Sequence, residues 1–288
     1  MNVHQLELFY HVVVHQGVSQ AARVLDKEQP TLSKQINDLE DALRVKLYFR
    51  RPFKLTEKGE VLFRSIEPFF QQLPKLEEMV KGGDLLRIGA SPIVLMHHLP
   101  AVEQAVRKTF PKLHLLLREA SQPQLLQMLD RGEIDLAITL LPAELPAKVF
   151  SRELLRISPT LIVPKKSHLA SAEALWAQPE IEQSLICLTA DEMLCRTFQQ
   201  ELKRRDLEWR PRIEVGSLGL VEHYVQLGYG IGLSLRLPGV RLSPKLRALE
   251  LPGFPDLPLG MLWRDDLDKL LRAFRAEVQN RAAQISHC

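Results

Sequence analysis

The hydrophobic residues of the first 80 positions recur at helical spacing. Over 4–14, four apolar side chains fall on one face of a helix, namely Leu6, Phe9, Tyr10 and Val13. Gly17 breaks this pattern, and we expect Ser19 to cap a short second helix. A third helix is predicted over about 29–42, with an apolar face made of Leu32, Ile36, Leu39 and Leu43. These helices predict a small helical domain in this part of the chain.

The segment after the third helix predicts a β-hairpin with a basic tip. In LYFRRPFKLTEKG, apolar residues stand on both sides of a proline turn, and Arg50, Arg51 and Lys54 surround it. A helix, a tight turn, a second helix and such a hairpin together predict a winged helix-turn-helix. From Arg44 to Lys58, six basic residues stand against one acidic residue, an excess that indicates a phosphate-binding patch. A solvated basic face is the alternative interpretation.

A long helical pattern continues from 56 to about 81. Its apolar stripe predicts a partner helix, most simply the same helix of a second copy. The stripe consists of Leu62, Ile66, Phe69, Phe70, Leu73 and Leu76. We expect Pro68 and Pro74 to kink or break this helix, and we interpret Lys-Gly-Gly-Asp at 81–84 as a hinge.

From residue 85 onward, apolar strands alternate with helices. Strands are predicted at 85–90, 113–118 and 135–140, and again at 160–163, 185–188, 213–215 and 233–235. A last strand at 259–263 and a helix over 267–285 complete the pattern. Such alternation is typical of α/β units with parallel sheets, and two successive sets predict two lobes around a cleft.

Composition excludes several classes of protein. Hydrophobic residues make up 45% and charged residues 25% of the 288 positions, as in ordinary globular proteins, so a disordered chain is excluded. No apolar stretch is as long as a membrane span, and the N-terminal segment lacks the unbroken apolar core of a secretory signal. Three cysteines, an odd number, favour a reducing compartment. We therefore expect a cytoplasmic protein without a membrane partner.

Five segments, taken in order, resemble the LysR-type transcriptional regulators of bacteria over essentially the whole chain. They are LELFYHVVVHQGVSQAARVLDKEQPTLSKQINDLEDALRVKLYFR, LTEKGEVL, LRIGAS, GEIDLAI and GYGIGLSL. The resemblance implies an α/β fold class with three parts. These are a winged helix-turn-helix DNA-binding domain at 1–58, a linker and dimerisation helix with a hinge at 59–84, and an effector-binding domain at 85–288.

The effector-binding domain implied by the resemblance has two lobes, like a periplasmic solute-binding protein. Lobe I is expected at about 85–159 plus 265–288, and lobe II at about 160–264. Regulators of this family bind operator DNA sequence-specifically as a homodimer or homotetramer, and a small-molecule effector in the cleft modulates DNA binding or activation. The implied partners are double-stranded DNA, the chain itself, RNA polymerase and the effector, in the cytoplasm at the nucleoid. No cofactor, metal or enzymatic activity is expected.

The resemblance places DNA contacts on the third helix and on the wing. Gln29 and Ser33 are expected to contact base edges, and Lys34 a base or a phosphate. Ser19 and Thr31 are expected to contact phosphates, and the arginines of the wing are expected in the minor groove. The complete predicted set is Ser19, Gln29, Pro30, Thr31, Ser33, Lys34, Asn37, Arg50, Arg51 and Lys54.

Three features depart from the family's pattern. Glu28 stands where the family usually has a serine, and Glu is a weaker N-cap that repels a nearby phosphate. The entry to the second helix is one residue shorter than the common form, and the wing is shortened at 50–53. A small-molecule-binding module with a degenerate, weakly DNA-binding head is therefore an alternative function.

The resemblance places the effector at the ends of strands in both lobes. Ser91 is expected to cap the following helix and to bind an anionic ligand with that helix's N–H groups; a cap without a ligand is the alternative. Thr139 ends a strand of lobe I, and Thr189 lies at the corresponding edge of lobe II. The predicted effector-binding set is Ser91, Pro92, Ser121, Gln122, Thr139, Thr189, Gly230 and Ile231.

Other chemistry has less support. The GYGIG segment lacks the spacing of a dinucleotide-binding loop, and His97 and His98 diverge by about 100° on a helix, which is unsuitable for one metal. No catalytic signature occurs, so an enzyme is the least supported class. Cys187 and Cys195 fall in lobe II, where some members of the family sense peroxide through two cysteines. Redox sensing is thus a further alternative, beside a buried structural thiol.

Overall fold

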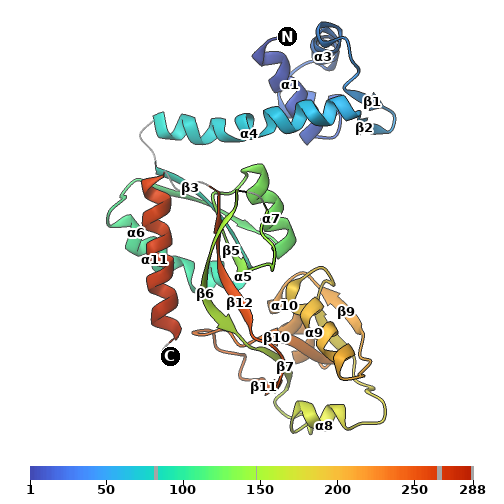
Figure 1. The fold of residues 1–288 in the computed structure, drawn as a ribbon, viewed down its shortest axis with the longest axis vertical. Helices are drawn as coiled ribbons and strands as arrows, with labels where there is room; N and C mark the ends of the chain where they lie inside the picture. Colours follow the sequence, from blue (N-terminus) through green and yellow to red (C-terminus); the bar gives the residue numbers. More distant parts are fainter. Residues whose placement is uncertain (81–83, 147, 265–267, 287–288) are drawn as a thin grey trace. The chain divides into compact units, whose positions relative to one another are not determined.

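The computed structural model describes residues 1–80, 84–146, 148–264 and 268–286, apart from the side chains of 74–75 and 77–79. The chain divides into two compact units, Met1–Lys81 and Gly82–Cys288, which we call the N-terminal and C-terminal units (Figure 1). Most of the predicted hinge at 81–84 lies outside the described residues. None of the helices in the described part of the chain is long and apolar enough to cross a membrane.

The N-terminal unit is a winged helix-turn-helix followed by a long helix. Its elements are α1 Val3–Val14, α2 Val18–Val24, α3 Gln29–Leu43, β1 Tyr48–Arg50, β2 Phe53–Leu55 and α4 Glu57–Val80. The two strands pair antiparallel, with Tyr48 opposite Leu55 and Arg50 opposite Phe53, which confirms the predicted hairpin.

Helix α1 packs against neighbours on two sides. Most of its predicted apolar face is only half-buried, and its fully buried apolar residues are Leu8, Phe9 and Val12. On the other side, the Tyr10 ring stacks on Phe63 and Phe70 of α4, with ring centroids 5.9 and 5.4 Å away. The predicted apolar face of α1 omitted Leu8 and Val12, because α1 contacts both α3 and α4 and buries residues on more than one side.

One local expectation for the N-terminal unit is wrong, and a second is wrong in one of its two alternatives. Ser19 does not cap α2, because it is the second residue of that helix and Gly17 holds the N-cap position. Helix α4 continues through Pro68 and Pro74, so the expected break does not occur. A proline inside a helix removes one backbone hydrogen bond. The stacking of Tyr10 on residues before and after Pro68 offsets that loss.

Lobe I of the C-terminal unit is built on a five-stranded sheet of order β4-β3-β5-β12-β6. Its strands are β3 Asp84–Ala90, β4 Leu113–Glu119, β5 Leu136–Leu140, β6 Phe150–Ile157 and β12 Leu257–Trp263. Its helices are α5 Pro92–His97, α6 Leu99–Arg107, α7 Gln122–Arg131 and α11 Lys269–Ser286. Strand β3 runs parallel to β4 and β5, whereas β12 runs antiparallel to β5 and β6.

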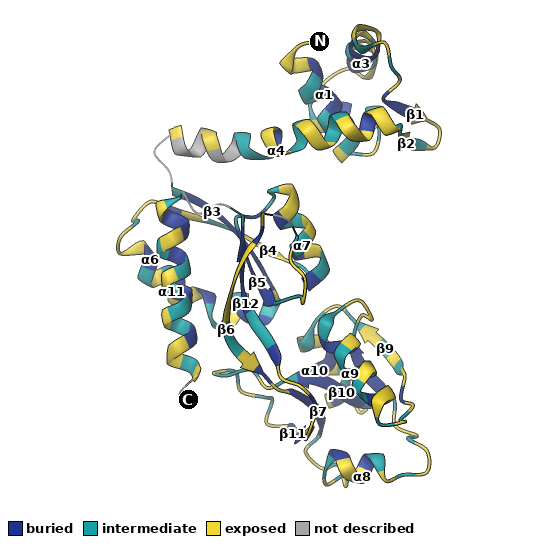
Figure 2. Ribbon diagram, viewed as in Figure 1, coloured by how far each residue is buried: buried dark blue, intermediate teal, exposed yellow. Residues whose placement is uncertain are grey.

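Lobe II has a second five-stranded sheet, of order β11-β7-β10-β8-β9. Its strands are β7 Pro159–Pro164, β8 Leu185–Leu188, β9 Pro211–Val215, β10 Ile231–Leu235 and β11 Leu246–Glu250. Its helices are α8 Ala172–Trp176, α9 Met193–Arg204 and α10 Leu218–Gln226. Strand β8 runs parallel to β9 and β10. The central strands of both sheets are buried (Figure 2), and the predicted α/β fold class is confirmed.

Strand β12 corrects the predicted boundary between the lobes. The sequence analysis assigned 160–264 to lobe II, but β12 pairs with β5 and β6 of lobe I. Met261 and Leu262 of this strand are completely buried in the first sheet, which explains the return of the chain. Strands β6 and β11 were not predicted. Most of β6 is exposed and carries polar residues, so it lacks the apolar run by which the other strands were found.

A buried ion pair joins two neighbouring strands of lobe I. Arg87 of β3 and Asp135, just before β5, have side chains that are 9% and 8% exposed, with Nη2 and Oδ1 2.8 Å apart. The Arg87 backbone N–H also donates to Oδ2 at 2.9 Å, and the Asp135 N–H donates to the Arg87 carbonyl at 2.8 Å. Removal of one charge would therefore leave the other buried and uncompensated.

We expect Asp135→Asn to lower the free energy of unfolding by about 3–5 kcal/mol, the usual effect of breaking a buried pair. Urea unfolding followed by circular dichroism measures this change. Asp130→Asn is the matched control, because Asp130 is exposed and lies 3.6 Å from Arg264; its effect should stay below about 1 kcal/mol. Equal unfolding midpoints for the two variants would contradict the assignment.

Candidate functional site

The first turns of α3 present polar side chains to solvent. Gln29, Pro30, Thr31 and Lys34 are exposed, and Ser33 and Asn37 are half-exposed. The opposite face of the helix is buried and consists of Leu32, Ile36 and Leu39. The predicted DNA-contacting residues of α3 therefore lie on its solvent-facing side.

A hydrogen bond ties α2 to the first turn of α3. The Ser19 hydroxyl donates to Gln29 Oε1 at 3.0 Å, so the group that Gln29 still offers is its amide NH₂. The preceding residue, Glu28, holds the N-cap position of α3 and makes no capping hydrogen bond with its side chain. Glu28, which stands where the family usually has a serine, therefore leaves the N-terminus of α3 without a side-chain cap.

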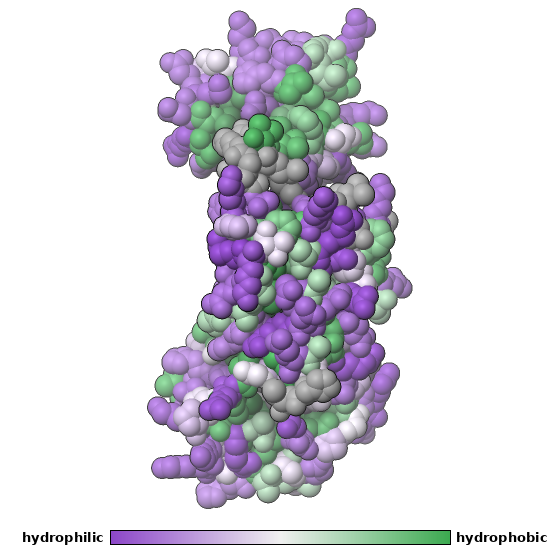
Figure 3. Space-filling view, turned by 90° about the vertical axis from the view of Figure 1, so that its left-hand side faces the viewer, coloured by the Kyte–Doolittle hydropathy of each residue, from purple (hydrophilic) through white to green (hydrophobic). Residues whose placement is uncertain are grey.

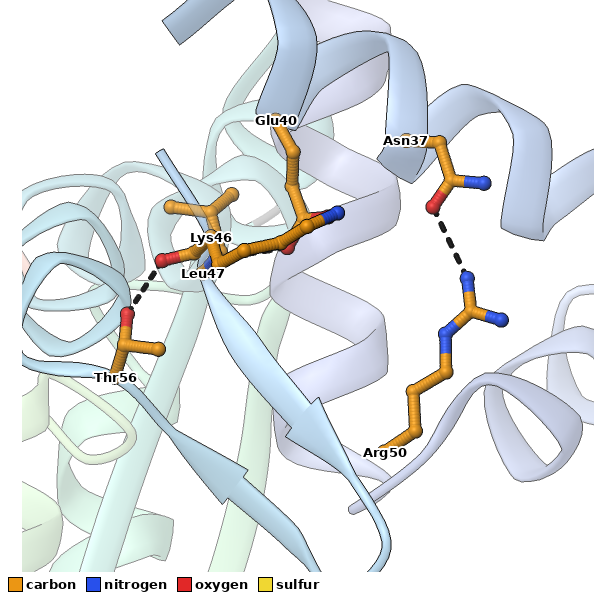
Figure 4. A network of polar contacts seen from close by, with 6 residues as sticks. All are labelled: Asn37, Glu40, Lys46, Leu47, Arg50 and Thr56. Atoms are coloured by element: carbon orange, nitrogen blue, oxygen red, sulfur yellow. Dashed lines mark hydrogen bonds and ion pairs between the residues drawn. The ribbon is translucent and has the colours of Figure 1, made fainter. Parts of the chain in front are cut away.

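The wing is tied to α3 by a second hydrogen bond. Arg50 of β1 donates from Nη2 to Asn37 Oδ1 of α3 at 3.0 Å (Figure 4). Arg50, Arg51 and Lys54 are all exposed, and they surround the two-residue turn of the hairpin. Two predicted DNA contacts, Asn37 and Arg50, thus bind each other and connect the helix with the wing.

A buried carboxylate fixes the start of the wing. Glu40 is 5% exposed, and its Oε1 accepts the Leu47 N–H at 2.8 Å while Oε2 accepts Lys46 Nζ at 2.6 Å. The same hydrogen bond raises the pKa of Lys46. The Thr56 hydroxyl donates to the Lys46 carbonyl at 2.6 Å (Figure 4). Glu40 was not among the predicted site residues. Its position four residues after Ile36, on the apolar stripe of α3, was a signal that could have indicated its burial.

In the C-terminal unit, a cavity of about 170 Å³ lies between the two lobes. Five predicted effector residues line it, and all of them come from lobe I: Ser91, Pro92, Ser121, Gln122 and Thr139. Ser91 precedes α5 but makes no capping hydrogen bond with its side chain, so the expected capping role is wrong and its hydroxyl remains available. The Gln122 side chain donates to the Leu140 carbonyl at 2.9 Å and is buried.

Three predicted effector residues of lobe II do not line the cavity. Gly230 and Ile231 stand at the start of β10, whereas the cavity touches Leu235 at its end. A Cβ at Gly230 would lie 2.1 Å from the Ser184 carbonyl oxygen, so close backbone packing explains this glycine. Thr189 is exposed, and its carbonyl accepts the Glu192 N–H at 3.0 Å in the turn before α9.

Two polar residues of lobe II that the sequence analysis missed line the cavity instead. Ser217 caps α10 through a hydrogen bond from the Leu220 N–H. Glu192 is the N-cap residue of α9, and its Oε1 accepts the Gln122 N–H across the cleft at 3.2 Å. Burial raises the pKa of Glu192. Both residues follow strands that run parallel to each other, and the shared edge of such strands was the signal that would have found them.

The two lobe II cysteines lie together in the core. Cys187 and Cys195 are 1% and 2% exposed, and both thiols donate to the Leu188 carbonyl, at 3.0 and 3.1 Å. The neighbouring Cys187 thiol and burial raise the pKa of Cys195. Among the described residues, no group of three or more His, Cys, Asp or Glu could hold a metal ion.

Two protein family models match the chain, one within the N-terminal unit and one within the C-terminal unit. Residues 3–60 match the family model of the bacterial regulatory helix-turn-helix protein of the lysR family, and residues 82–283 match that of the LysR substrate binding domain. The regulator CysB of Burkholderia cenocepacia is 26% identical over 94% of this chain and 87% of its own. The dual regulator OxyR of Escherichia coli K12 is 36% identical over half of each chain.

Solved structures share the fold. CbnR, a LysR family regulator, superimposes with a TM-score of 0.68 at 17% identity, over 98% of this chain and 99% of its own. CbnR in complex with its target DNA gives a TM-score of 0.67, also at 17% identity, over 98% of this chain and 100% of its own.

Substitution of Glu40 tests whether its carboxylate holds the wing. Glu40→Ala leaves the buried Leu47 N–H without its partner, so we expect the N-terminal unit to lose about 1–3 kcal/mol of unfolding free energy. Scanning calorimetry of the full chain measures the loss. The control is Glu60→Ala, an exposed position 3.5 Å from Arg64, where the effect should be within about 0.5 kcal/mol. A stable Glu40→Ala variant would contradict the role of the carboxylate.

Proposed function

The chain belongs to the LysR family of bacterial transcriptional regulators, and we propose that its α3 and wing bind operator DNA under the control of a small molecule in the cleft. The hydrogen bond between Arg50 and Asn37 is the observation that carries this proposal. It joins an exposed polar helix to a basic hairpin. One rigid surface thereby presents groups for the major groove and for the backbone or minor groove.

The chemistry of each exposed residue fits one part of a DNA duplex. The free NH₂ of Gln29 suits acceptor atoms on a base edge, and Lys34 suits a phosphate or a guanine. Arg51 at the tip of the wing suits the negative potential of a narrow minor groove. The exposed carboxylate of Glu28 opposes phosphate binding locally, and the adjacent basic residue is Lys27.

A second copy of the chain is the partner that we propose for α4. Large apolar side chains on this helix are exposed, with exposed fractions of 60% for Val61, 52% for Phe69 and 47% for Leu76. Figure 3 also shows hydrophobic side chains at the surface of the N-terminal unit. A dimer through α4 would cover these exposed side chains and supply two recognition helices for a partly palindromic operator at the nucleoid, with RNA polymerase as a further partner.

The cleft, in this proposal, binds its effector without turning it over and without a cofactor. Its described lining includes serine hydroxyls but no histidine, lysine or cysteine. Among the described residues, none of these hydroxyls forms a hydrogen bond with Glu192, and a serine without a bonded base is a weak nucleophile. Ligand binding would act by favouring one arrangement of the lobes over another.

Selection from random DNA with the purified full-length protein tests operator binding. We expect a partly palindromic motif, bound at least about 10³-fold more tightly than unrelated DNA. Gln29→Ala should relax specificity at one base pair by about 1–3 kcal/mol. Arg51→Ala should weaken binding and reduce the salt dependence by about one phosphate contact. Arg204→Ala, an exposed change in the C-terminal unit, is the control. If no motif is enriched, the result would favour the alternative function, a small-molecule-binding module with a weakly DNA-binding N-terminal unit.

Redox sensing is a second candidate function, favoured by the contact of Cys187 and Cys195 through one carbonyl. One peroxide would take two electrons and two protons from the two thiols, giving a disulfide and two waters. Thiolate is the reactive form. The contact between the two thiols raises the pKa of Cys195 and lowers that of Cys187. Both thiols are buried in the core, which shields the pair from peroxide in the native state.

We therefore expect stoichiometric peroxide to leave operator affinity unchanged within about twofold. A Cys288→Ser background removes the third cysteine, and fluorescence anisotropy with the selected operator gives the affinity. Cys187→Ser in the same background is the matched variant. A change of affinity that needs Cys187, and that a thiol reductant reverses, would instead establish the redox function.

A further inference from the structure

The cleft carries a single kind of charge. Among the described residues that line it, Glu192 alone is charged, and the others are apolar, hydroxyl, amide or glycine residues. Arginine, lysine and histidine, which would hold an anionic ligand, are not part of this described lining. The electrostatics of the cavity therefore disfavour a second negative charge near Glu192.

The position where α7 would bind an anion is already occupied by the protein itself. Gln122 is the first residue of α7, and its N–H donates to Glu192 Oε1 at 3.2 Å. Helix N-termini attract negative charge, and here the carboxylate comes from the opposite lobe. An added anion would have to displace Glu192 or lie beside it.

The Glu192 carboxylate is incompletely compensated. Burial is the largest influence on its pKa and raises it, while the Gln122 N–H lowers it; the nearby charges of Asp191 and Arg196 raise and lower it to a smaller extent. A ligand with a positive charge and several N–H donors would supply the missing compensation. None of the described residues donates a hydrogen bond to the second carboxylate oxygen, Oε2.

The rest of the cavity wall is apolar. Ile93, Val94 and Met96 line it from lobe I, and Leu188, Leu218 and Leu235 line it from lobe II. Apolar walls stabilise an alkyl or aryl body by removing its surface from water. A cavity of about 170 Å³ limits that body to a small group.

We propose that the effector of this cleft is a small amphiphilic amine, whose ammonium group binds Glu192 and whose alkyl or aryl body contacts the apolar wall. The inference rests on the proposed function of the cleft as the effector site. The ammonium group binds the carboxylate beside the Gln122 N–H, so occupation of the site acts on the residue that joins the two lobes. Glu192 is thereby the residue that selects the charge of the ligand.

Calorimetric titration of the full-length protein with charge-matched probes tests this proposal. Each of three skeletons, 2-methylpropyl, 3-methylbutyl and 2-phenylethyl, is supplied as its amine, its alcohol and its carboxylate. We expect at least one amine to bind about tenfold or more tightly than its alcohol, and each carboxylate to bind least tightly. A factor of ten corresponds to about 1.4 kcal/mol.

Two variants separate charge recognition from structure. Glu192→Gln keeps an oxygen for the Gln122 N–H but removes the charge, so amine affinity should fall about tenfold while alcohol affinity changes less than about threefold. Asp191→Asn is the matched control, because Asp191 is the adjacent carboxylate, is exposed and does not line the cavity. It should leave amine affinity within about threefold.

The outcomes distinguish this inference from the proposed function. The inference is overturned if no amine binds more tightly than its alcohol, or if Glu192→Gln leaves amine affinity unchanged. Tighter binding of a carboxylate at the cleft would also overturn it, while the cleft would still be the effector site. Operator binding is measured independently by selection, so its failure would count against the proposed function and not against the choice of an amine.

Discussion

Parallel strands place their carboxyl ends at the same edge of a sheet, and the ligand cleft depends on this constraint. In lobe I, β3 runs parallel to β4 and β5, so the segments after β3 and β4 carry Ser91 and Ser121, and the end of β5 carries Thr139, to one edge. In lobe II, the segments after β8 and β9 bring Glu192 and Ser217 to the facing edge. The two sets meet because the chain passes between the lobes at 158 and again over 251–256.

Buried polar groups give each unit a specific geometry. A carboxylate or a backbone N–H that is removed from water needs a partner, and Glu40 supplies one for the first residues of the wing. In lobe I, Asp135 does the same for Arg87 across two strands. The apolar cores would tolerate small shifts of these elements, whereas the short hydrogen bonds allow few positions. The start of the wing and the pairing of β3 with β5 are therefore fixed by polar contacts as well as by apolar packing.

Periodicity and turn chemistry were sufficient to predict the helices of the N-terminal unit, the hairpin and most of the α/β pattern. They did not predict that β12 returns to lobe I, because strand pairing over a long separation leaves no local signal. The family resemblance, in turn, placed the ligand at Gly230, where the glycine instead allows close contact with the Ser184 carbonyl. Thr189 and Glu192 both follow β8, and the turn between them decides which of the two lines the cleft. The sequence alone does not specify that turn.

The hydrogen bond between Gln122 and Glu192 connects ligand chemistry to the arrangement of the lobes. An effector can shift a conformational equilibrium only to the extent that it binds one state more tightly. A molecule that contacts apolar side chains of both lobes equally in both states would have little such preference. A molecule that binds Glu192 would have such a preference, because it acts on the group whose hydrogen bond with the Gln122 N–H joins the two lobes. Since Gln122 is itself anchored to the Leu140 carbonyl, such binding would act on lobe II through α9, which begins directly after Glu192.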